Sequence, residues 1–239
     1  MRRDKQAGLI GAVLTLLSGS AAAFTIATTA ISDFSVDDDG WVVQTFSDNG
    51  APNFNSLFVP GSFTPTHHAT GGNPDGFISI TDPNEGWTYF VAPSKFLGNQ
   101  SDKVGGTLSF SLQQSAGSIF QPEPPHVALR SGSSVLVLDA GVVPAFTPAW
   151  TAYSVALTAG EWRVGTLTGA LATAGDFATV LSNLSALYIA GEFVTPVVET
   201  NGLDSVSLAP VPLPAAVWGM VNALALLRGR RIRRALTPN

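Results

Sequence analysis

The side chains of this sequence best suited to metal binding or catalysis are its carboxylates. Those that could bind a metal lie in two regions of the chain. Asp33 and a run of three aspartates at 37–39 lie near the start, and Asp204 lies in an apolar Leu-Asp-Ser-Val run near the end. A hard cation such as Ca²⁺ needs several oxygen ligands, including carboxylates. We therefore expect a structural Ca²⁺ with Asp33, Asp39 and Asp204 as metal ligands, because a carboxylate that points inward from a strand needs a partner. The competing interpretation is a solvated aspartate turn, with Asp204 pointing outward.

Glycoside hydrolysis would need two carboxylates roughly 5–10 Å apart in a cleft. Glu192 is the glutamate of most interest because it ends an expected strand, but a solvated or arginine-paired edge position would also explain it. The motifs of serine hydrolases, zinc proteases, dinucleotide-binding folds and P-loops are absent, and the chain has no cysteine. The sequence therefore predicts no enzyme and no catalytic residue, with a carbohydrate-active hydrolase or its accessory module as the alternative.

Histidines and aromatic side chains offer two further kinds of site. His67 and His68 are adjacent in an expected extended loop, so their side chains should point apart and not chelate a metal; His126 follows two prolines. Exposed aromatic rings could stack on sugar rings, although alternation with polar residues favours core positions for most of them. The candidate rings are Trp41, Trp87, Tyr89, Trp150, Tyr153, Trp162 and Tyr188.

The charge balance restricts the partners of the region between the two chain ends. Residues 24–210 contain four basic and sixteen acidic side chains, a formal charge of −12. Such a surface repels phosphate backbones, which argues against nucleic-acid binding, but it attracts divalent cations. Without cysteine, stability must come from core burial.

The elements that would position these residues are mainly strands. Runs of β-forming residues between Gly, Pro, Asn and Asp clusters predict strands at 41–46, 77–81, 87–92, 106–113, 127–130, 135–139, 151–157, 186–192 and 203–208. Short strands at this spacing predict a two-sheet sandwich. Apolar residues at 177, 180, 181 and 184 predict one short helix packed at the sandwich end, with Asp176 in its first turn. We expect 47–76 to be loop.

The N-terminus has the features of a signal peptide. Basic residues at 2, 3 and 5 precede an apolar stretch at 7–17, which is too short to span a bilayer. Ala21 and Ala23 then satisfy the small-residue rule of signal peptidase. We expect a signal helix over 1–23 and a mature chain that starts near Phe24.

The C-terminus combines a proline motif, an apolar segment and an arginine cluster. Pro212, Leu213 and Pro214 precede an apolar run that ends at Leu227 and is only marginally long enough for one membrane span. The basic cluster that follows would stay on the cytoplasmic side. It consists of Arg228, Arg230, Arg231, Arg233 and Arg234.

These C-terminal residues resemble the PEP-CTERM sorting signal in its VPLPA form. The resemblance implies that 211–239 holds the exported protein in the inner membrane as an apolar helix. It also implies that an exosortase-type enzyme then cuts near the Pro-x-Pro motif and releases the protein to the cell surface or the extracellular matrix. Departures from the pattern are the short helix with Asn222 and the residues after the arginines.

The central region resembles the laminin IV type A (laminin B) domain over roughly 34–208. An aromatic strand runs into Ala-Pro-Ser-Lys-Phe-Leu-Gly at 92–98, followed by a polar loop and Gly-Gly-Thr-Leu-Ser-Phe at 105–110. The resemblance implies an all-β jelly-roll sandwich related to galactose-binding-like and carbohydrate-binding modules, with a non-catalytic extracellular role. Pro93 should end the strand, Phe96 should fill the core at a turn, and Gly98 should let the chain reverse.

Taken together, the sequence predicts a signal peptide over 1–23, a sandwich ectodomain over 24–210 and a sorting signal over 211–239. The expected function is that of an adhesive or exopolysaccharide-associated surface or matrix protein. A purely structural envelope component is the second alternative to it, besides the hydrolase.

Overall fold

The computed structural model describes residues 28–48, 51–115, 125–141, 144–193 and 197–212 of the 239-residue chain. Strands dominate this part, with one α-helix and two short 3₁₀ turns. The strands are β1 (Ala30–Ser32), β2 (Val42–Asp48), β3 (Pro52–Leu57), β4 (Thr66–His68), β5 (Phe77–Thr81), β6 (Trp87–Val91), β7 (Thr107–Gln114), β8 (Val127–Ser131), β9 (Ser134–Leu138), β10 (Ala145–Phe146), β11 (Thr151–Ala156), β12 (Arg163–Val164), β13 (Ala186–Ala190) and β14 (Thr200–Ala209). The helix is α1 (Ala174–Ser182), and the 3₁₀ turns are η1 (Ser94–Phe96) and η2 (Ser101–Lys103).

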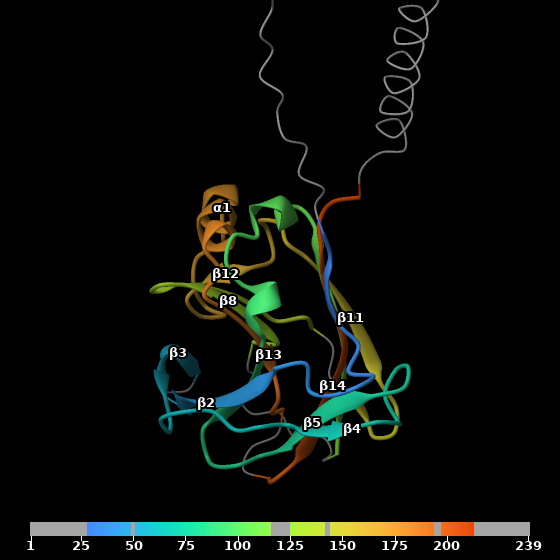
Figure 1. Cartoon of the computed structure of the whole chain (residues 1–239). Helices are drawn as coiled ribbons and strands as arrows, with labels where there is room; N and C mark the ends of the chain where they lie inside the picture. The colour runs from blue at the N-terminus through green and yellow to red at the C-terminus, as the bar shows by residue number, and fades with distance from the viewer. Residues whose placement is uncertain (1–27, 49–50, 116–124, 142–143, 194–196, 213–239) are drawn as a thin grey trace, which may run out of the picture.

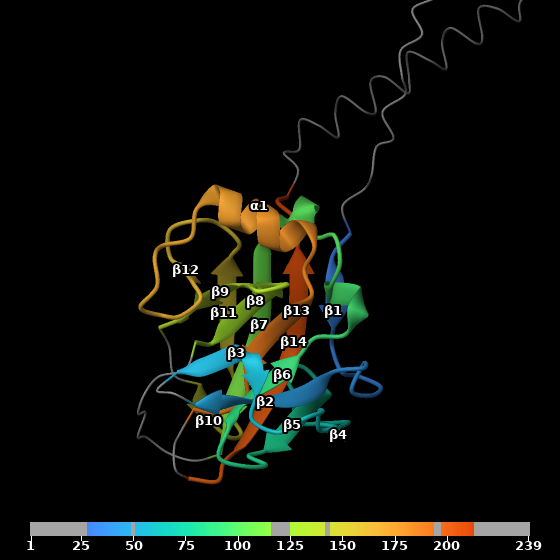
Figure 2. The ribbon, with the colours of Figure 1, turned by 90° about the vertical axis from the view of Figure 1, so that its left-hand side faces the viewer.

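The strands form two seven-stranded sheets (Figures 1 and 2). The first, sheet A, runs β10-β7-β14-β5-β4, with β1 also paired to β14 and β11 to β7. The second, sheet B, runs β12-β9-β8-β13-β6-β2-β3. All pairs are antiparallel except β10 with β7. The predicted all-β jelly-roll sandwich with one short helix is confirmed.

The core lies between the sheets and follows from alternation along the strands. Leu108, Phe110 and Leu112 of β7 share one face, as predicted, and each is at most 1% exposed. They belong to one buried cluster with Phe90 of β6 and Leu187 of β13. Burial of these side chains supplies the main driving force for folding in a domain without disulfides.

Part of the outer face of sheet B is also buried, because the side chain of Phe54 in the edge strand β3 packs on it. Tyr89 and Tyr188 alternate with inward-facing neighbours, so they lie on the side away from sheet A. Phe54 of β3 packs on them, with ring centroids 4.9 Å from Tyr89 and 5.1 Å from Tyr188, and Phe46 completes the cluster. Aromatic pairs at such distances add to the energy of area burial. This second layer of apolar side chains fixes β3 on the sheet.

The segment 92–98 turns the chain as the sequence predicts. Strand β6 ends at Val91, before Pro93, and η1 buries Phe96 completely against Trp41 at a centroid distance of 5.5 Å. Gly98 follows with φ +82°, a conformation that an L side chain rarely adopts. The motif therefore has an architectural role.

Helix α1 closes one end of the sandwich, as predicted (Figure 2). The prediction that 47–76 is loop is wrong, because β3 and β4 lie there. Both are edge strands, rich in Asn, Pro and Thr, and tertiary packing overrides their weak local preference. Strands β1, β10 and β12 have only two or three residues, too few to show alternation in a sequence.

Candidate functional site

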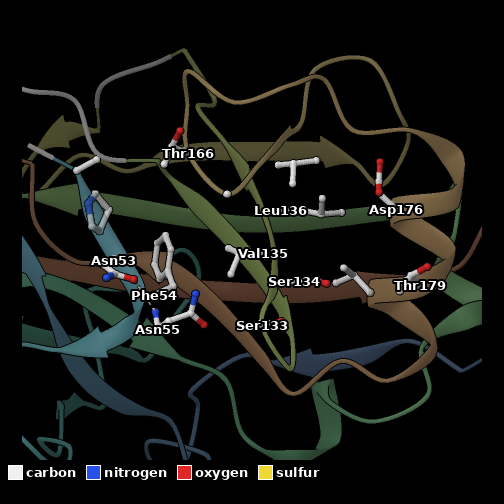
Figure 3. A pocket seen from close by; sticks show the side chains of 15 residues that line it. Asn53, Phe54, Asn55, Ser133, Ser134, Val135, Leu136, Thr166, Asp176 and Thr179 are labelled. Carbon is white, nitrogen blue, oxygen red and sulfur yellow. Dashed lines mark hydrogen bonds between the residues drawn. The ribbon is translucent and has the colours of Figure 1, made fainter. Parts of the chain in front are cut away.

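A groove on the outer side of sheet B is the candidate binding site. It has a volume of about 590 Å³ and lies between β3 on one side and α1 on the other, with the β8–β9 turn and β9 between them (Figure 3). Four separate chain segments line it. The lining residues are Ala51, Pro52, Asn53, Phe54, Asn55, Ser133, Ser134, Val135, Leu136, Val164, Gly165, Thr166, Asp176, Thr179 and Val180.

The β3 wall of the groove is set by the alternation of that strand. Phe54 points down into the aromatic cluster and is 2% exposed, so its neighbours Asn53 and Asn55 point outward. The side chain of Asn53 accepts a hydrogen bond from the backbone N–H of Asn55 at 3.1 Å. Arg130 reinforces the wall from below, since its Nη1 donates to the Phe54 carbonyl at 2.7 Å. The groove thus receives amide side chains from a firmly held strand.

The α1 wall is set by a capping box. The hydroxyl of Thr173 accepts from the backbone N–H of Asp176, and the carboxylate of Asp176 accepts from the backbone N–H of Thr173 at 2.7 Å. These hydrogen bonds hold the pKa of Asp176 below its ordinary value. The helix buries Phe177, Val180 and Leu181, and leaves Thr179 exposed to the groove.

The floor of the groove combines an apolar strip with free hydroxyls. Gly132, with φ +58°, starts the two-residue turn between β8 and β9 and presents Ser133 and Ser134 beside the buried Val135. Within the part of the chain that the structure describes, the side chains of Asn55, Ser133 and Ser134 make no hydrogen bond. Amides and hydroxyls in this arrangement suit a ligand rich in hydroxyl groups.

Within the described ranges, the lining of the groove does not include the pair of free carboxylates that glycoside hydrolysis needs. Asp176 is the one acidic residue among its lining, and its carboxylate serves as a helix cap. A second cavity, of about 570 Å³, is lined by Asp139, Glu161 and Arg163 beside β11 and β12. Asp139 there lies 3.0 Å from the ring of the buried His126, so it is engaged with a neighbour as well.

Glu192 is neither solvated nor paired with arginine, contrary to both explanations that its position in the sequence suggested. It is 4% exposed, and its Oε2 accepts from the backbone N–H of Thr88 in β6 at 3.0 Å. Burial raises its pKa to about 8, with further upward contributions from Asp82 and Glu199 and an opposing one from the Thr88 bond. Glu192 lines neither of the two cavities and acts as a structural residue.

The aromatic rings are mainly core residues, as expected. Trp41, Trp87, Tyr89, Tyr153, Trp162 and Tyr188 are at most 6% exposed. Trp150 is half-buried on the outer face of sheet A, where its Nε1 donates to Gly71 at 3.0 Å and its ring meets Phe77 edge-on. The two adjacent histidines diverge: His67 bonds to the Phe34 carbonyl, and His68 to Ser79.

The three expected calcium ligands do not all converge. Asp204 is fully buried and accepts from the backbone N–H groups of Asn73 and Ser205, at the point where β14 bulges. Burial raises its pKa, and the nearby charge of Asp33 raises it further. Asp39 pairs with Lys95 instead. In the described ranges, no three His, Cys, Asp or Glu side chains form a metal-binding group.

The predicted processing signals lie almost entirely outside the described residues. Ala21, Ala23, Leu213, Pro214 and the arginine cluster fall there, and only Pro212 is described, as an exposed residue just after β14. No helix within the described ranges is long and apolar enough to cross a membrane. Strand β1 pairs with the end of β14, so both ends of the described domain leave from the same pole (Figure 1).

Comparison with known proteins identifies the domain. The Laminin B (Domain IV) family matches residues 89–212. Among solved structures, the L4b domain of human laminin alpha-2 is similar at 14% identity and a TM-score of 0.58, covering 77% of this chain and 98% of that one. A family 11 carbohydrate-binding module of a cellulosomal cellulase from Clostridium thermocellum is similar at 14% identity and a TM-score of 0.45, covering 78% of this chain and 97% of that one. No curated protein matches.

Proposed function

Since the chain belongs to the laminin B (domain IV) family, whose modules are extracellular and non-catalytic, we propose that it is an exported surface or matrix protein that binds a glycan chain in the groove on sheet B. The observation that carries the proposal is the groove itself, which joins uncommitted amide and hydroxyl side chains to an apolar floor. Adhesion to a polysaccharide matrix would follow from such binding.

The two other candidate functions find less support. A hydrolase would need a cleft with two available carboxylates, and the single acid of the groove is a helix cap. A purely structural envelope component does not need a groove lined by exposed amide and hydroxyl side chains. Binding of a glycan therefore accounts for more of the described structure than either alternative.

Substitution of two polar side chains tests the groove as a glycan site. Replacing Asn55 and Ser134 together by alanine should weaken glycan binding by about tenfold or more, because each neutral hydrogen bond contributes about 1 kcal/mol. Both side chains are exposed, so the free energy of unfolding should hardly change. A glycan array identifies a ligand, and isothermal titration of the full chain, in a zwitterionic detergent without a sugar headgroup, then measures its affinity.

Thr158→Ala is the matched control, since Thr158 is an exposed hydroxyl residue outside the groove. It should bind like the wild type. The proposal fails if the full chain binds no glycan on the array, or if the double variant binds as tightly as the wild type.

Calcium remains part of the proposal, with Asp33 and Asp204 as the residues that would hold it. Burial is the main cause of the raised pKa of Asp204, and a divalent cation between the two carboxylates would offset both the burial of its charge and its repulsion by Asp33. Calcium at a hundred times its dissociation constant would add about 2.7 kcal/mol to the free energy of unfolding. The melting temperature should therefore rise by roughly 5–10 °C.

Calorimetry in CaCl₂ and in EDTA checks this expectation. Asp33→Asn should abolish the response to calcium, whereas Glu85→Gln, which removes an exposed charge elsewhere, should keep it. Equal melting temperatures in calcium and EDTA would rule the calcium site out.

Processing at both ends is the last part of the proposal. Export after cleavage near Ala23, followed by exosortase-type cleavage near Pro212, would release the domain from a transient inner-membrane intermediate without touching its core, because β14 ends at Ala209. Pro212→Ala combined with Pro214→Ala should retain the protein in the inner-membrane fraction. Fractionation of the cells checks the retention of the variant. Mass spectrometry of the exported wild-type protein locates its C-terminus, and a mature chain that still ends at Asn239 would contradict the proposed cleavage.

A further inference from the structure

Among the residues that the structure describes, none of those that line the groove on sheet B is cationic. Its lining consists of amide, hydroxyl and apolar residues and one acid, Asp176. The carboxylate of Asp176 is kept ionised by its hydrogen bonds to Thr173. A ligand in the groove therefore meets neutral hydrogen-bonding groups and one negative charge.

The basic residues of the domain are not among the residues that line this site. Residues 24–210 contain four, and each is held by its own surroundings. Lys95 pairs with Asp39 and bonds to the Ile31 carbonyl. Lys103 is 2% exposed, bonds to the Thr28 carbonyl at 2.6 Å and pairs with Asp102.

Each of the two arginines donates to a backbone carbonyl. Nη1 of Arg130 donates to the Phe54 carbonyl at 2.7 Å, underneath β3, and Nη1 of Arg163 donates to the Gly169 carbonyl at 2.9 Å. Arg130 and Arg163 are absent from the lining of the groove. Recognition of a carboxylate, sulfate or phosphate group relies on such cations, with arginine the usual choice.

Resting on the proposed glycan-binding function, we infer that the groove selects uncharged glycan chains and rejects uronic-acid, sulfated and phosphorylated ones. Two effects act together. The formal charge of −12 over 24–210 repels an anionic chain at long range, and Asp176 repels it locally. Neutral sugar hydroxyls, in contrast, find partners in Asn55, Ser133 and Ser134.

The test compares pairs of glycans that differ only in charge. The probes are hexamers of β-1,4-glucose and β-1,4-glucuronate, and of β-1,4-mannose and β-1,4-mannuronate, together with a glycan array. The full chain in sugar-free zwitterionic detergent should bind neutral array members and should prefer the neutral member of a pair by about tenfold or more at low salt. The preference should shrink in about 0.5 M NaCl, where screening is strong.

A charge introduced at one position separates the local effect from the global one. Thr179→Lys places a cation on the exposed face of α1 within the groove, and Thr158→Lys makes the same change in net charge outside it. Thr179→Lys should raise the affinity for the uronate hexamers by about tenfold, whereas Thr158→Lys should change it by less than about threefold. Thermal unfolding of both variants confirms that they are folded.

The outcomes distinguish the inference from the function on which it rests. If acidic glycans bind the wild type as tightly as their neutral counterparts, or if both lysine variants gain affinity equally, the inference on charge is wrong and the glycan-binding function stands. If no glycan, neutral or acidic, binds the full chain, the proposed function fails and the inference falls with it.

Discussion

Raising the pH from about 5 to about 8 should lower the free energy of unfolding, and Glu192→Gln should remove most of that dependence. The pKa of Glu192 is raised from 4.5 to about 8 in the folded chain, mainly by burial. Between these values the folded state keeps a proton that the unfolded state has lost, so unfolding releases a proton and stability falls as the pH rises. Each pH unit within this window costs about 1.4 kcal/mol, and the whole window on the order of 4 kcal/mol.

Glutamine is a close replacement, because its Oε1 can still accept from the Thr88 N–H that Glu192 now engages. Urea unfolding at several pH values measures the effect. Wild type and Glu192→Gln should have similar stabilities near pH 5 and diverge toward pH 8, with the variant more stable. Glu85→Gln, an exposed control, should follow the wild type. Parallel curves for wild type and Glu192→Gln would show that the buried carboxyl does not retain its proton.

Replacing Phe96 by alanine should lower the free energy of unfolding by about 3–5 kcal/mol. The ring is completely buried in η1 and packs edge-on against Trp41, which itself donates a hydrogen bond to Ser32 of β1 at 2.8 Å. Removing it leaves a cavity at the turn that joins β6 to the rest of the sandwich. The prediction tests whether the Ala-Pro-Ser-Lys-Phe-Leu-Gly segment is architectural.

Leu97→Ala is the matched control within the same segment, because Leu97 is only partly buried. It should cost clearly less than Phe96→Ala in the same urea titration. Both variants should keep their glycan affinity under conditions where they are folded, since neither residue lines the groove. A cost below about 1 kcal/mol for Phe96→Ala would contradict the architectural role.

Local patterns in the sequence predicted the central elements of the fold. Alternation of Leu108, Phe110 and Leu112 placed the interior face of β7 correctly, and the spacing of Phe177, Val180 and Leu181 located α1. Strand β3 was missed, because a Pro-Asn-Phe-Asn run has weak strand preference and is held by Phe54 packing on Tyr89 and Tyr188. Such long-range contacts leave no local signal.

The candidate site was less accessible to sequence analysis. The groove unites residues near 53, 134, 165 and 178, and none of these segments carries a motif. The aspartate run predicted Asp39 as a metal ligand from composition, but in the structure Asp39 pairs with Lys95. The buried carboxylate of Glu192 accepts a hydrogen bond from the backbone N–H of Thr88, more than a hundred residues earlier in the chain. Sites of this kind form where segments that are distant in the sequence meet in the fold, so no local motif marks them.

The glycan site on sheet B is tested most directly by a crystal structure of the full chain with its tightest neutral oligosaccharide. We expect sugar rings in the groove between β3 and α1, with hydroxyl groups within hydrogen-bond distance of Asn55 and Ser134. An oligosaccharide on the opposite sheet, stacked over the half-buried Trp150, would contradict it.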